Sequence, residues 1–478
     1  MSQELRTMCV HALRWWKPCR IWKGRFCALS VLALLGVPAP GQYRVAGYYP
    51  MWNKSFLPPG GINYSAVTHI FHAFDWPNAD GSIASGESGV DTALINTTHR
   101  ASRKIVLSLG GAGATQAANF ATVAADSNLR KAFAANVVSW ITSRHYDGVD
   151  LDWEGPANAA DKANEVSLVK QLRAALQAAD SSLLLTMAVG ASPWSGQWRD
   201  YSTLEQYVDW FNAMEYDFHG SWSSLAGHNA PLYAGTDPLT DPDYYSIDLS
   251  YQYLVGTRGI SKSKILLGMP FYGKSFGTSV LYSSYTGEQD LAYRDILSSV
   301  GSGVWVYTWD AGSSAPLYVS DRPARIITLD DSLSIALKCQ YAKTNGLAGV
   351  MIWEITQDVV GSSQPLMDVV GSQMFGTSSI DLAPLPAAPV SYALERNFPN
   401  PFNPSTTIRF TIPISAHVTI RVFDILGREV ATLLDAEKGA GSWSVLFDAT
   451  SRRIASGVYY YRMDAGGFVA TGKMILTR

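Results

Sequence analysis

The chain has 478 residues, 47% of them hydrophobic and 12% aromatic, which suffices for two or three folded domains and argues against disorder. Its formal net charge is −3, and because residues 1–41 carry an excess of five positive charges, the rest stands at about −8. A chain this acidic lacks the electrostatic footprint of a nucleic-acid partner and any basic tract for an anionic membrane surface.

Residues 1–41 have the pattern of a signal peptide. Basic side chains over 14–25 precede an apolar run over 26–35, and the small residues Ala39 and Gly41 follow. The run is shorter than the roughly 20 residues that a spanning helix needs, which disfavours a membrane anchor. The basic segment is long for a signal peptide, so Met8 is an alternative start.

Three of the four cysteines lie in this N-terminal segment. Only Cys339 would remain after cleavage, so we expect no intramolecular disulfide even at an oxidising destination. Cys339 falls at helical spacing with Ile335 and Ala342, which indicates a small core residue rather than a nucleophile.

Eight short apolar runs alternate with helical patterns over 42–373. The runs are RVAGYY, VTHIFHAF, KIVLSLGG, DGVDLDWE, LLLTMAVG, WFNAMEYD, ILLGMPFYG and LAGVMIWE. Helical periodicity is clearest over 128–144 and 161–179. This alternation predicts an α/β fold, a closed TIM (βα)8 barrel. A doubly wound open sheet is disfavoured because no run precedes a dinucleotide-type glycine fingerprint.

The connection between the seventh and eighth runs, about 274–345, is too long for a simple βα loop. Segments 304–309 and 325–328 have strand character, so we expect a small α+β insertion there. Its aromatic residues would either line a groove or form its core. They are Tyr282, Tyr285, Tyr293, Trp305, Tyr307 and Trp309.

The chain changes character after the predicted barrel. A linker rich in Pro, Ala and Ser is expected over 374–394. Over 395–478, alternating polar and apolar residues with turn signals such as LGRE and AGGF predict a small antiparallel β-sandwich.

The run DGVDLDWE is the most informative. Alternate side chains of a strand share a face, so Asp150, Asp152 and Glu154 point one way and the intervening apolar residues the other. Packing of the apolar face against helices would send the three carboxyls into the barrel interior. Glu154 would then lie nearest the C-terminal rim, where barrel active sites form.

Three acids in one column need compensation, because burying unpaired carboxylates is costly. The neighbouring runs VLSLGG and LLLTMAVG contain no Lys, Arg or His. We therefore expect the acids to share protons, with one group protonated near neutral pH and suited to general-acid cleavage of a glycosidic bond. An inert acid network and a hard-metal site are alternatives, although one rigid strand is awkward for wrapping a cation; no metal or cofactor is expected.

DGVDLDWE resembles the DGxDxDxE signature of family 18 glycoside hydrolases, the chitinases. SLGG, MEYD, FHGSW, GMPFYGKSF and GLAGVMIWE match further family motifs in order, so the resemblance covers about 43–373. It implies hydrolysis of β-1,4-linked N-acetylglucosamine polymers with net retention. The substrate's own acetamido group would be the nucleophile and form an oxazolinium intermediate, an exception to the two-carboxylate scheme.

The resemblance also implies a role for each matched residue. Glu154 would protonate the leaving oxygen, Asp152 would hold the acetamido N–H, and Asp150 would tune Asp152 from beneath. Tyr216 and Asp217 would hold the acetamido group of the distorted sugar. The other matched positions surround that sugar or stack sugars farther along the cleft, unless they are ordinary core. They are Tyr48, Phe74, Met214, Tyr272, Trp353, Trp52 and Trp222.

Three positions depart from the family pattern. Ala112 stands where a Trp commonly follows SxGG, so one sugar platform is expected to be missing. Lys274, another candidate substrate-binding residue, stands where an Arg is frequent, which weakens a bidentate contact. Glu215 is often a small residue. His219, in FHGSW, is interpreted as a structural hydrogen-bonding residue rather than a base.

The remaining segments carry resemblances of their own. The insertion resembles one found in a chitinase subfamily, where it deepens the cleft and fits exo-type action. NFPNPFNPSTTIRF, FDILGREV, ASGVYYYR and GKMILTR resemble the type A sorting domain of the type IX secretion system. This implies a Gram-negative source, the secretion machinery as partner, and an extracellular or cell-surface location. A carbohydrate-binding sandwich, suggested by Trp443 and Tyr459–Tyr461, is the competing interpretation.

Two other functions compete with the chitinase hypothesis. An endo-β-N-acetylglucosaminidase acting on glycoprotein glycans or peptidoglycan would use the same machinery, but such relatives usually lack the insertion. A chitin-binding lectin on the same barrel would typically lack Glu154. We expect a monomer that takes chitin or chito-oligosaccharides, with no nucleic-acid partner and no transmembrane span in the mature chain.

Overall fold

The computed structural model describes residues 43–84, 91–238, 246–301, 304–376, 392–394, 396–397, 399–412, 416–438, 441–449 and 454–477. The expected signal peptide over 1–41 lies outside the described residues, as does most of the expected linker. Among the helices of these described ranges, none combines the length and apolar character needed to span a bilayer.

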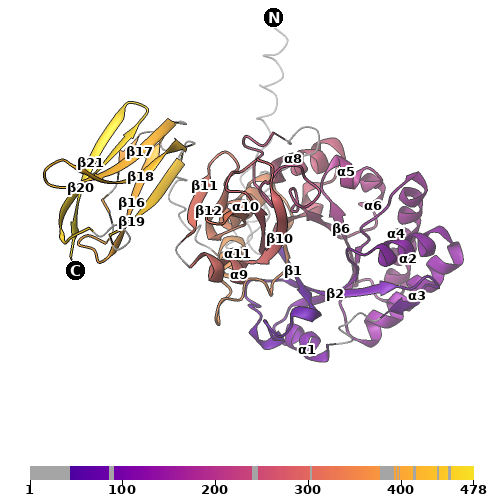
Figure 1. The fold of residues 1–478 in the computed structure, drawn as a ribbon. Coiled ribbons are helices and arrows are strands. Elements are labelled where there is room, and N and C mark those ends of the chain that lie inside the picture. Colours follow the sequence, from indigo (N-terminus) through magenta and orange to yellow (C-terminus); the bar gives the residue numbers. More distant parts are fainter. Residues whose placement is uncertain are drawn as a thin grey trace, which may run out of the picture. The chain divides into compact units, whose positions relative to one another are not determined.

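Eight parallel strands form the predicted closed barrel (Figure 1). They follow the order β1-β14-β8-β7-β6-β5-β4-β2, and pairing of β1 with β2 closes the ring. Each of the eight expected runs is a strand of this barrel, and the closure excludes a doubly wound open sheet. The strands are β1 (Arg44–Pro50), β2 (His69–Pro77), β4 (Lys104–Gly110), β5 (Gly148–Asp152), β6 (Leu184–Gly190), β7 (Trp210–Met214), β8 (Ile265–Pro270) and β14 (Gly349–Trp353).

Helices follow the strands and cover their outer side. The two clearest predicted helices begin after Asp126 and Asn158, whose side chains accept hydrogen bonds from backbone N–H groups of the first turn. The longer barrel helices are α1 (Thr92–Arg100), α2 (Ala114–Ala125), α3 (Ser127–Ser143), α4 (Ala159–Ala179), α10 (Ser332–Asn345) and α11 (Pro365–Phe375). The short ones are α5 (Pro193–Gly196), α6 (Tyr201–Leu204) and α8 (Ile247–Tyr251).

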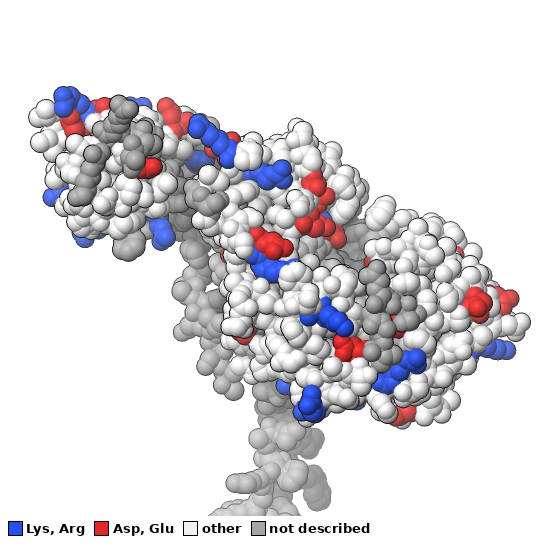
Figure 2. All heavy atoms as spheres, turned by 60° about the horizontal axis from the view of Figure 1, so that its bottom comes forward, with Lys and Arg blue, Asp and Glu red and all other residues white. Residues whose placement is uncertain are grey.

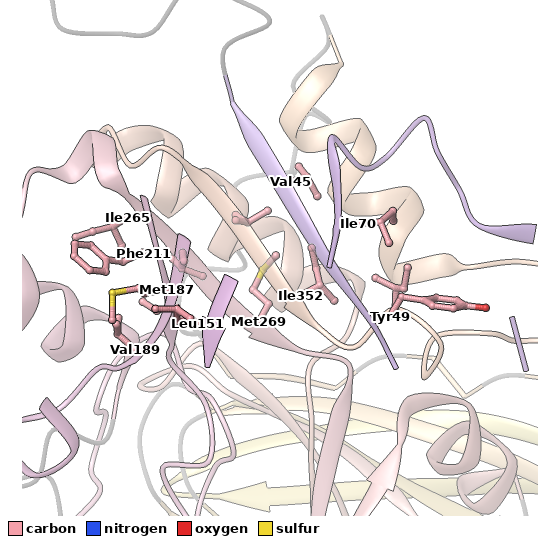
Figure 3. Packing of buried hydrophobic residues seen from close by; sticks show 14 of the residues in the cluster. Val45, Tyr49, Ile70, Leu151, Met187, Val189, Phe211, Ile265, Met269 and Ile352 are labelled. Carbon is pink, nitrogen blue, oxygen red and sulfur yellow. The ribbon is translucent and has the colours of Figure 1, made fainter. Parts of the chain in front are cut away.

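Strand alternation divides the apolar residues between two cores. On β1, Val45 and Tyr49 belong to the large cluster shared with the helices, whereas Ala46 and Tyr48 belong to a smaller cluster inside the barrel. Figure 3 shows ten labelled members of the outer set. They are Val45, Tyr49, Ile70, Leu151, Met187, Val189, Phe211, Ile265, Met269 and Ile352. Because Leu151 packs outward, its neighbours Asp150 and Asp152 must face the interior.

A five-stranded antiparallel sheet is inserted between β8 and β14, in the order β10-β9-β13-β12-β11. The insertion comprises the five strands β9 (Tyr272–Gly277), β10 (Thr286–Ala292), β11 (Val306–Asp310), β12 (Ala315–Asp321) and β13 (Ala324–Thr328), with the helix α9 (Tyr293–Val300) between β10 and β11. Tyr293 is buried, and Trp305 and Trp309 pack against the main core, so these rings form core rather than an open groove.

The insertion ends earlier than expected. Its last strand stops at Thr328, and α10 packs against β8 and β14 as a helix of the barrel layer. An Asp331–Ser334 capping box begins α10, and Gly346 ends it with a left-handed φ of 71°. Cys339 is buried in this helix, as its spacing predicted. The long connection to the last strand thus contained the barrel helix that every βα unit needs.

The C-terminal module is a β-sandwich of antiparallel sheets, β15-β16-β19 and β18-β17-β20-β21. Its strands are β15 (Ala393–Leu394), β16 (Ser405–Ile412), β17 (Ala416–Phe423), β18 (Glu429–Lys438), β19 (Gly441–Asp448), β20 (Gly457–Ala465) and β21 (Phe468–Leu476). Phe410, Ile420 and Met463 share a core between the sheets. Strand alternation buries Tyr459 and Tyr461, which weakens the case for an exposed sugar-binding tyrosine cluster.

Candidate active site

Asp150 lies buried inside the barrel and accepts four hydrogen bonds from neutral donors. Its Oδ2 accepts from the hydroxyls of Tyr48 and Ser108, both at 2.8 Å. Its Oδ1 accepts from the Thr186 hydroxyl at 2.6 Å and from Asn212 Nδ2 at 3.2 Å. Burial raises the pKa of Asp150, and these hydrogen bonds oppose the rise. The surrounding strands therefore compensate this buried carboxyl with neutral donors rather than with charged groups.

Asp152 and Glu154 follow Asp150 toward the rim, with Glu154 just beyond the end of β5. Asp152 is 4% exposed, and its Oδ1 has no hydrogen-bond partner among the described residues. Burial, Glu154 and Asp150 together raise the pKa of Asp152 well above its usual value. Glu154 is accessible to solvent, yet burial and Asp217 raise its pKa too. All three acids thus hold protons to higher pH than ordinary carboxyls.

A buried cation behind the acids was missed from the sequence. Arg199 is 3% exposed, and its Nη1 lies 2.9 Å from Glu165 Oε1 on α4. Its Nη2 donates to the backbone carbonyl of Trp153, directly before Glu154. The positive charge lowers the pKa values of Asp152 and Glu154 and so offsets part of the effect of burial. Glu165 itself has its pKa raised to about 7 by burial, despite Arg199.

A second polar group lies beyond β7 and on β9. Asp217 Oδ1 accepts a hydrogen bond of 2.6 Å from the Tyr272 hydroxyl and lies 3.0 Å from Lys274 Nζ. Lys274 is 2% exposed and also contacts Asp290 at 2.6 Å and Glu288 at 3.5 Å. Lys274 therefore acts as a point charge among three carboxylates, rather than as the bidentate partner that an Arg would be. The contacts fix the Asp217 carboxylate at the barrel mouth.

Aromatic rings form a wall beside the acids. Phe74 and Trp353 stack with centroids 5.6 Å apart, and Trp353 meets Tyr48 edge-on at 5.5 Å. Because the Tyr48 hydroxyl donates to Asp150, the wall and the acid column are directly connected. The wall borders a cavity of about 350 Å3, within the size range of small-ligand sites. The cavity is lined by Trp52, Phe74, Trp76, Gly110, Gly111, Ala112, Gln116 and Trp353.

The other predicted sugar-binding residues lie around this wall. Trp52 is 51% exposed, with its ring 6.2 Å from that of Phe74. Trp222 is 62% exposed and lies away from the cavity lining, with Lys274 Nζ 5.1 Å from its ring. Met214 and Tyr216 are partly buried against the interior cluster, and Tyr216 lies 6.3 Å from Tyr272, ring to ring. The structure thus gathers the predicted residues at one end of the barrel.

Glu215 and His219 belong to the scaffold. Strand alternation turns Glu215 away from its neighbours Met214 and Tyr216, and its Oε2 accepts the N–H of Gly268 at 3.2 Å. Burial raises the pKa of Glu215 to about 8. His219 Nε2 lies 2.6 Å from Asp237, and its Nδ1 lies 3.1 Å from a backbone carbonyl. His219 is therefore a hydrogen-bonded structural residue, as its sequence context predicted.

Figure 2 shows acidic and basic side chains interspersed with uncharged residues over the face it presents. Mixed charge of this kind does not favour a polyanionic ligand on that face. The cavity beside the aromatic wall also suits a neutral ligand, because none of its lining residues carries a charge.

Comparison with known proteins identifies the family of the barrel and of the C-terminal module. Residues 44–358 match the sequence model of Glycosyl hydrolases family 18, and residues 396–477 match that of the Secretion system C-terminal sorting domain. A probable endochitinase of Caenorhabditis elegans is 30% identical over 373 residues, which are 69% of this chain and 60% of that protein. Chitinase 1 of Aphanocladium album is 30% identical over 392 residues, 70% of this chain and 88% of its own length.

A solved structure shares the barrel as well. The chitinase-like agglutinin of Robinia pseudoacacia is 28% identical, with a TM-score of 0.61 over 69% of this chain and 99% of its own. The matched range 44–358 contains the acid column, the aromatic wall and the insertion. From the match over these residues, the chain belongs to family 18 of the glycosyl hydrolases.

Proposed function

We propose that this chain is a secreted retaining chitinase that hydrolyses the β-1,4-N-acetylglucosamine linkages of chitin and chito-oligosaccharides. The observation that carries the proposal is Glu154, a solvent-accessible carboxyl with a raised pKa above two buried acids and beside an aromatic cavity. A carboxyl that keeps its proton toward neutral pH is suited to protonate a glycosidic oxygen.

In the first step, Glu154 gives its proton to the glycosidic oxygen, and the bond from that oxygen to the anomeric carbon breaks. The acetamido carbonyl oxygen of the sugar over Trp353 attacks the same carbon and closes a cationic oxazolinium ring. The unpartnered Oδ1 of Asp152 accepts the acetamido N–H, and its carboxylate offsets the new positive charge. Tyr216 and Asp217 hold the acetamido group, with Asp217 fixed by Tyr272 and Lys274.

In the second step, water attacks the anomeric carbon from the face that the leaving group vacated. Glu154, now ionised, takes a proton from that water and returns to its starting form. Two inversions at one carbon give net retention. The reaction needs neither metal nor cofactor, because the substrate supplies the nucleophile and Glu154 the proton.

The C-terminal module supports a proposed location outside the cell. We propose that residues 396–477, which match a secretion sorting domain, direct export by the type IX machinery of a Gram-negative cell. The polymeric substrate is insoluble and lies outside the cell, so an exported enzyme meets it there.

The decisive test is product analysis by mass spectrometry and proton NMR. The chain from residue 42 onward would be given a fully acetylated chitin hexamer and, separately, its deacetylated counterpart. Early products with a β-anomeric reducing end, from the acetylated hexamer alone, are expected. Glu154→Gln should lose nearly all turnover and keep binding; substantial residual activity would contradict the assigned role. Binding without cleavage by the parent enzyme would indicate a lectin, and cleavage of glycoprotein glycans alone an endo-β-N-acetylglucosaminidase.

A further inference from the structure

We propose that Trp76, together with Gln116, forms a subsite for one N-acetylglucosamine ring next to the ring that Trp353 carries. The inference rests on the proposed chitinase function and extends it to residues that neither the sequence motifs nor the family resemblance indicate. Both residues line the cavity beside the acids.

An irregularity in β2 turns Trp76 toward the cleft. Strand β2 pairs with β4 up to His72 and Leu107, and the pairing resumes at Asp75 and Leu109. Three steps along β2 therefore match two along β4, which is a β-bulge. Bulges re-aim the side chains that follow them and are common next to active sites.

Side-chain contacts on both sides of β2 agree with this shift. Phe71, before the bulge, and Ala73, within it, belong to the cluster inside the barrel. After it, Asp75 points to the helix layer, where Trp140 Nε1 of α3 donates to its Oδ2 at 3.1 Å. Phe74 and Trp76 consequently share the cleft face, and both line the cavity.

The backbone of Trp76 is held by a short hairpin. Trp76 pairs with Ala84 and Pro77 with Ile83 across the two strands β2 and β3 (Ile83–Ala84). A ring carried on a paired strand is preorganised, so little conformational entropy opposes stacking of a ligand on it. The hairpin thus presents Trp76 as a fixed platform.

The shape and chemistry of the cavity fit a neutral pyranose ring. The side formed by Gly110, Gly111 and Ala112 is free of large side chains, and Trp76 supplies an aromatic surface on the same cavity. Indole rings bind the apolar faces of sugars, while a few polar groups fix the ring's orientation. The Gln116 amide folds over Gly113 and makes no hydrogen bond within the described part of the chain. It is available as donor and acceptor for hydroxyl and acetamido groups.

The cavity continues into the catalytic site. It shares Phe74 and Trp353 with the aromatic wall, and the N–H of Gly111 donates to the carbonyl of Asp152 at 3.0 Å. Gln116 is followed by Ala117, which lies close to Gly155, the residue directly after Glu154. A Cβ placed on Gly155 would lie 3.3 Å from the Cβ of Ala117. A chitin chain with one ring on Trp353 therefore has a position for a second ring in the part of the cavity lined by Trp76 and Gln116.

The test measures binding of chito-oligosaccharides from dimer to hexamer by calorimetry, in the full mature chain carrying Glu154→Gln. Trp76→Ala should bind the hexamer about tenfold more weakly, which corresponds to the loss of one aromatic stacking contact. Trp76→Phe should recover part of the loss, and Gln116→Ala should weaken binding by a smaller factor. In the active enzyme, Trp76→Ala should raise KM for the hexamer and leave kcat nearly unchanged.

Tyr460→Ala, an exposed aromatic residue of the sandwich, is the matched control and should bind as the parent does. Hexamer affinity within twofold of the parent in a folded Trp76→Ala chain would overturn the proposal. Should Trp76→Ala fail to fold by thermal melting, Trp76→Phe and Gln116→Ala decide the matter, and parent-like binding by both would overturn it. Failure of the chitinase hypothesis gives a different result, because the enzyme with Glu154 intact would then not cleave the hexamer, whether or not it binds it.

Discussion

Replacing Arg199 with Met tests whether a buried charge sets the acidity of the catalytic column. The guanidinium lowers the pKa values of Asp152 and Glu154, so its removal should raise both further. In the proposed first step Glu154 must be protonated, so loss of that proton would set the alkaline limb of the pH–rate profile. This limb should therefore move to higher pH in Arg199→Met.

The stability cost follows from the partner that Arg199 leaves behind. Removing one member of a buried ion pair typically costs about 3–5 kcal/mol, because a charge stays unpaired. Glu165, however, has a pKa of about 7 even beside Arg199, and without that cation its pKa rises further. At pH 6 Glu165 is neutral, so Arg199→Met should lower the free energy of unfolding only by the contribution of the broken hydrogen bonds, about 1–3 kcal/mol. Above pH 7 Glu165 is ionised in the folded parent but still protonated in the folded variant. The difference in free energy of unfolding between the two should therefore grow by about 1.4 kcal/mol per pH unit.

The assay combines two measurements on the purified mature chain. Hydrolysis of the acetylated hexamer is followed from pH 4 to 9, and chemical denaturation is measured at pH 6 and pH 8. Arg199→Lys keeps the charge and should keep the parent's profile. Glu165→Gln leaves the Arg199 charge less neutralised and should move the alkaline limb in the opposite direction, to lower pH. A profile of Arg199→Met that superimposes on that of the parent would refute the electrostatic role.

Three further outcomes are expected. Buried carboxyls with pKa values raised to about 7 or 8 keep protons in the folded chain that the unfolded chain has lost. They are Glu165, Glu215, Glu354 and Asp358. Their stabilising effect is complete below about pH 4 and is lost progressively as pH rises from there through 7–8, so the thermal midpoint should fall from about pH 4.5 to 8 and level off above. Gly111→Ala should weaken hexamer binding at least tenfold, because its Cβ would lie 2.9 Å from the Phe74 ring at a φ of 90°. Thr186→Val should cost about 1–3 kcal/mol in denaturation and reduce kcat, because Asp150 loses its shortest hydrogen bond.

The barrel and the acid column were predictable because both rest on alternation along single strands. Each apolar run had enough length and β-forming residues to become a strand, and eight of them with intervening helices leave few architectures. On β5 the alternation of acidic and apolar residues assigned each side chain to a face without any knowledge of the neighbouring strands. The outward packing of Leu151 agrees with that assignment.

Partners that depend on register were harder to predict. Ser108 and Thr186 lie directly opposite Asp150 on the neighbouring strands, but the sequence specifies a strand's faces before it specifies its register. Asn212 donates to the same carboxylate from β7, which is two strands away from β5 in the barrel. Ser108 and Thr186 are hydroxyl residues on the inward faces of the two flanking strands, whereas Asn212 lies one strand farther along the barrel.

Arg199 and Trp76 were missed for a different reason. Arg199 lies in an irregular segment after α5 and reaches the acids only through the tertiary fold, where it pairs with Glu165. Trp76 follows a bulge, and strict alternation from the start of β2 would have pointed it to the wrong side. The orientation of neither side chain follows from the periodicity of the surrounding sequence, so it could not be predicted from that periodicity.

The gradient of hydrogen bonding along the column gives the three acids different tasks. Asp150, at the base, has four donors that favour its ionised form. Asp152, one step higher, is buried between two acids with an unpartnered oxygen, and burial together with these neighbouring acids raises its pKa well above the usual value. In the proposed mechanism, the positive charge of the oxazolinium ring above Asp152 would favour the carboxylate form of Asp152 over its protonated form. The proposed mechanism thus places Asp152, whose ionised form is costly in the resting enzyme, where its negative charge would stabilise the cation as that cation forms.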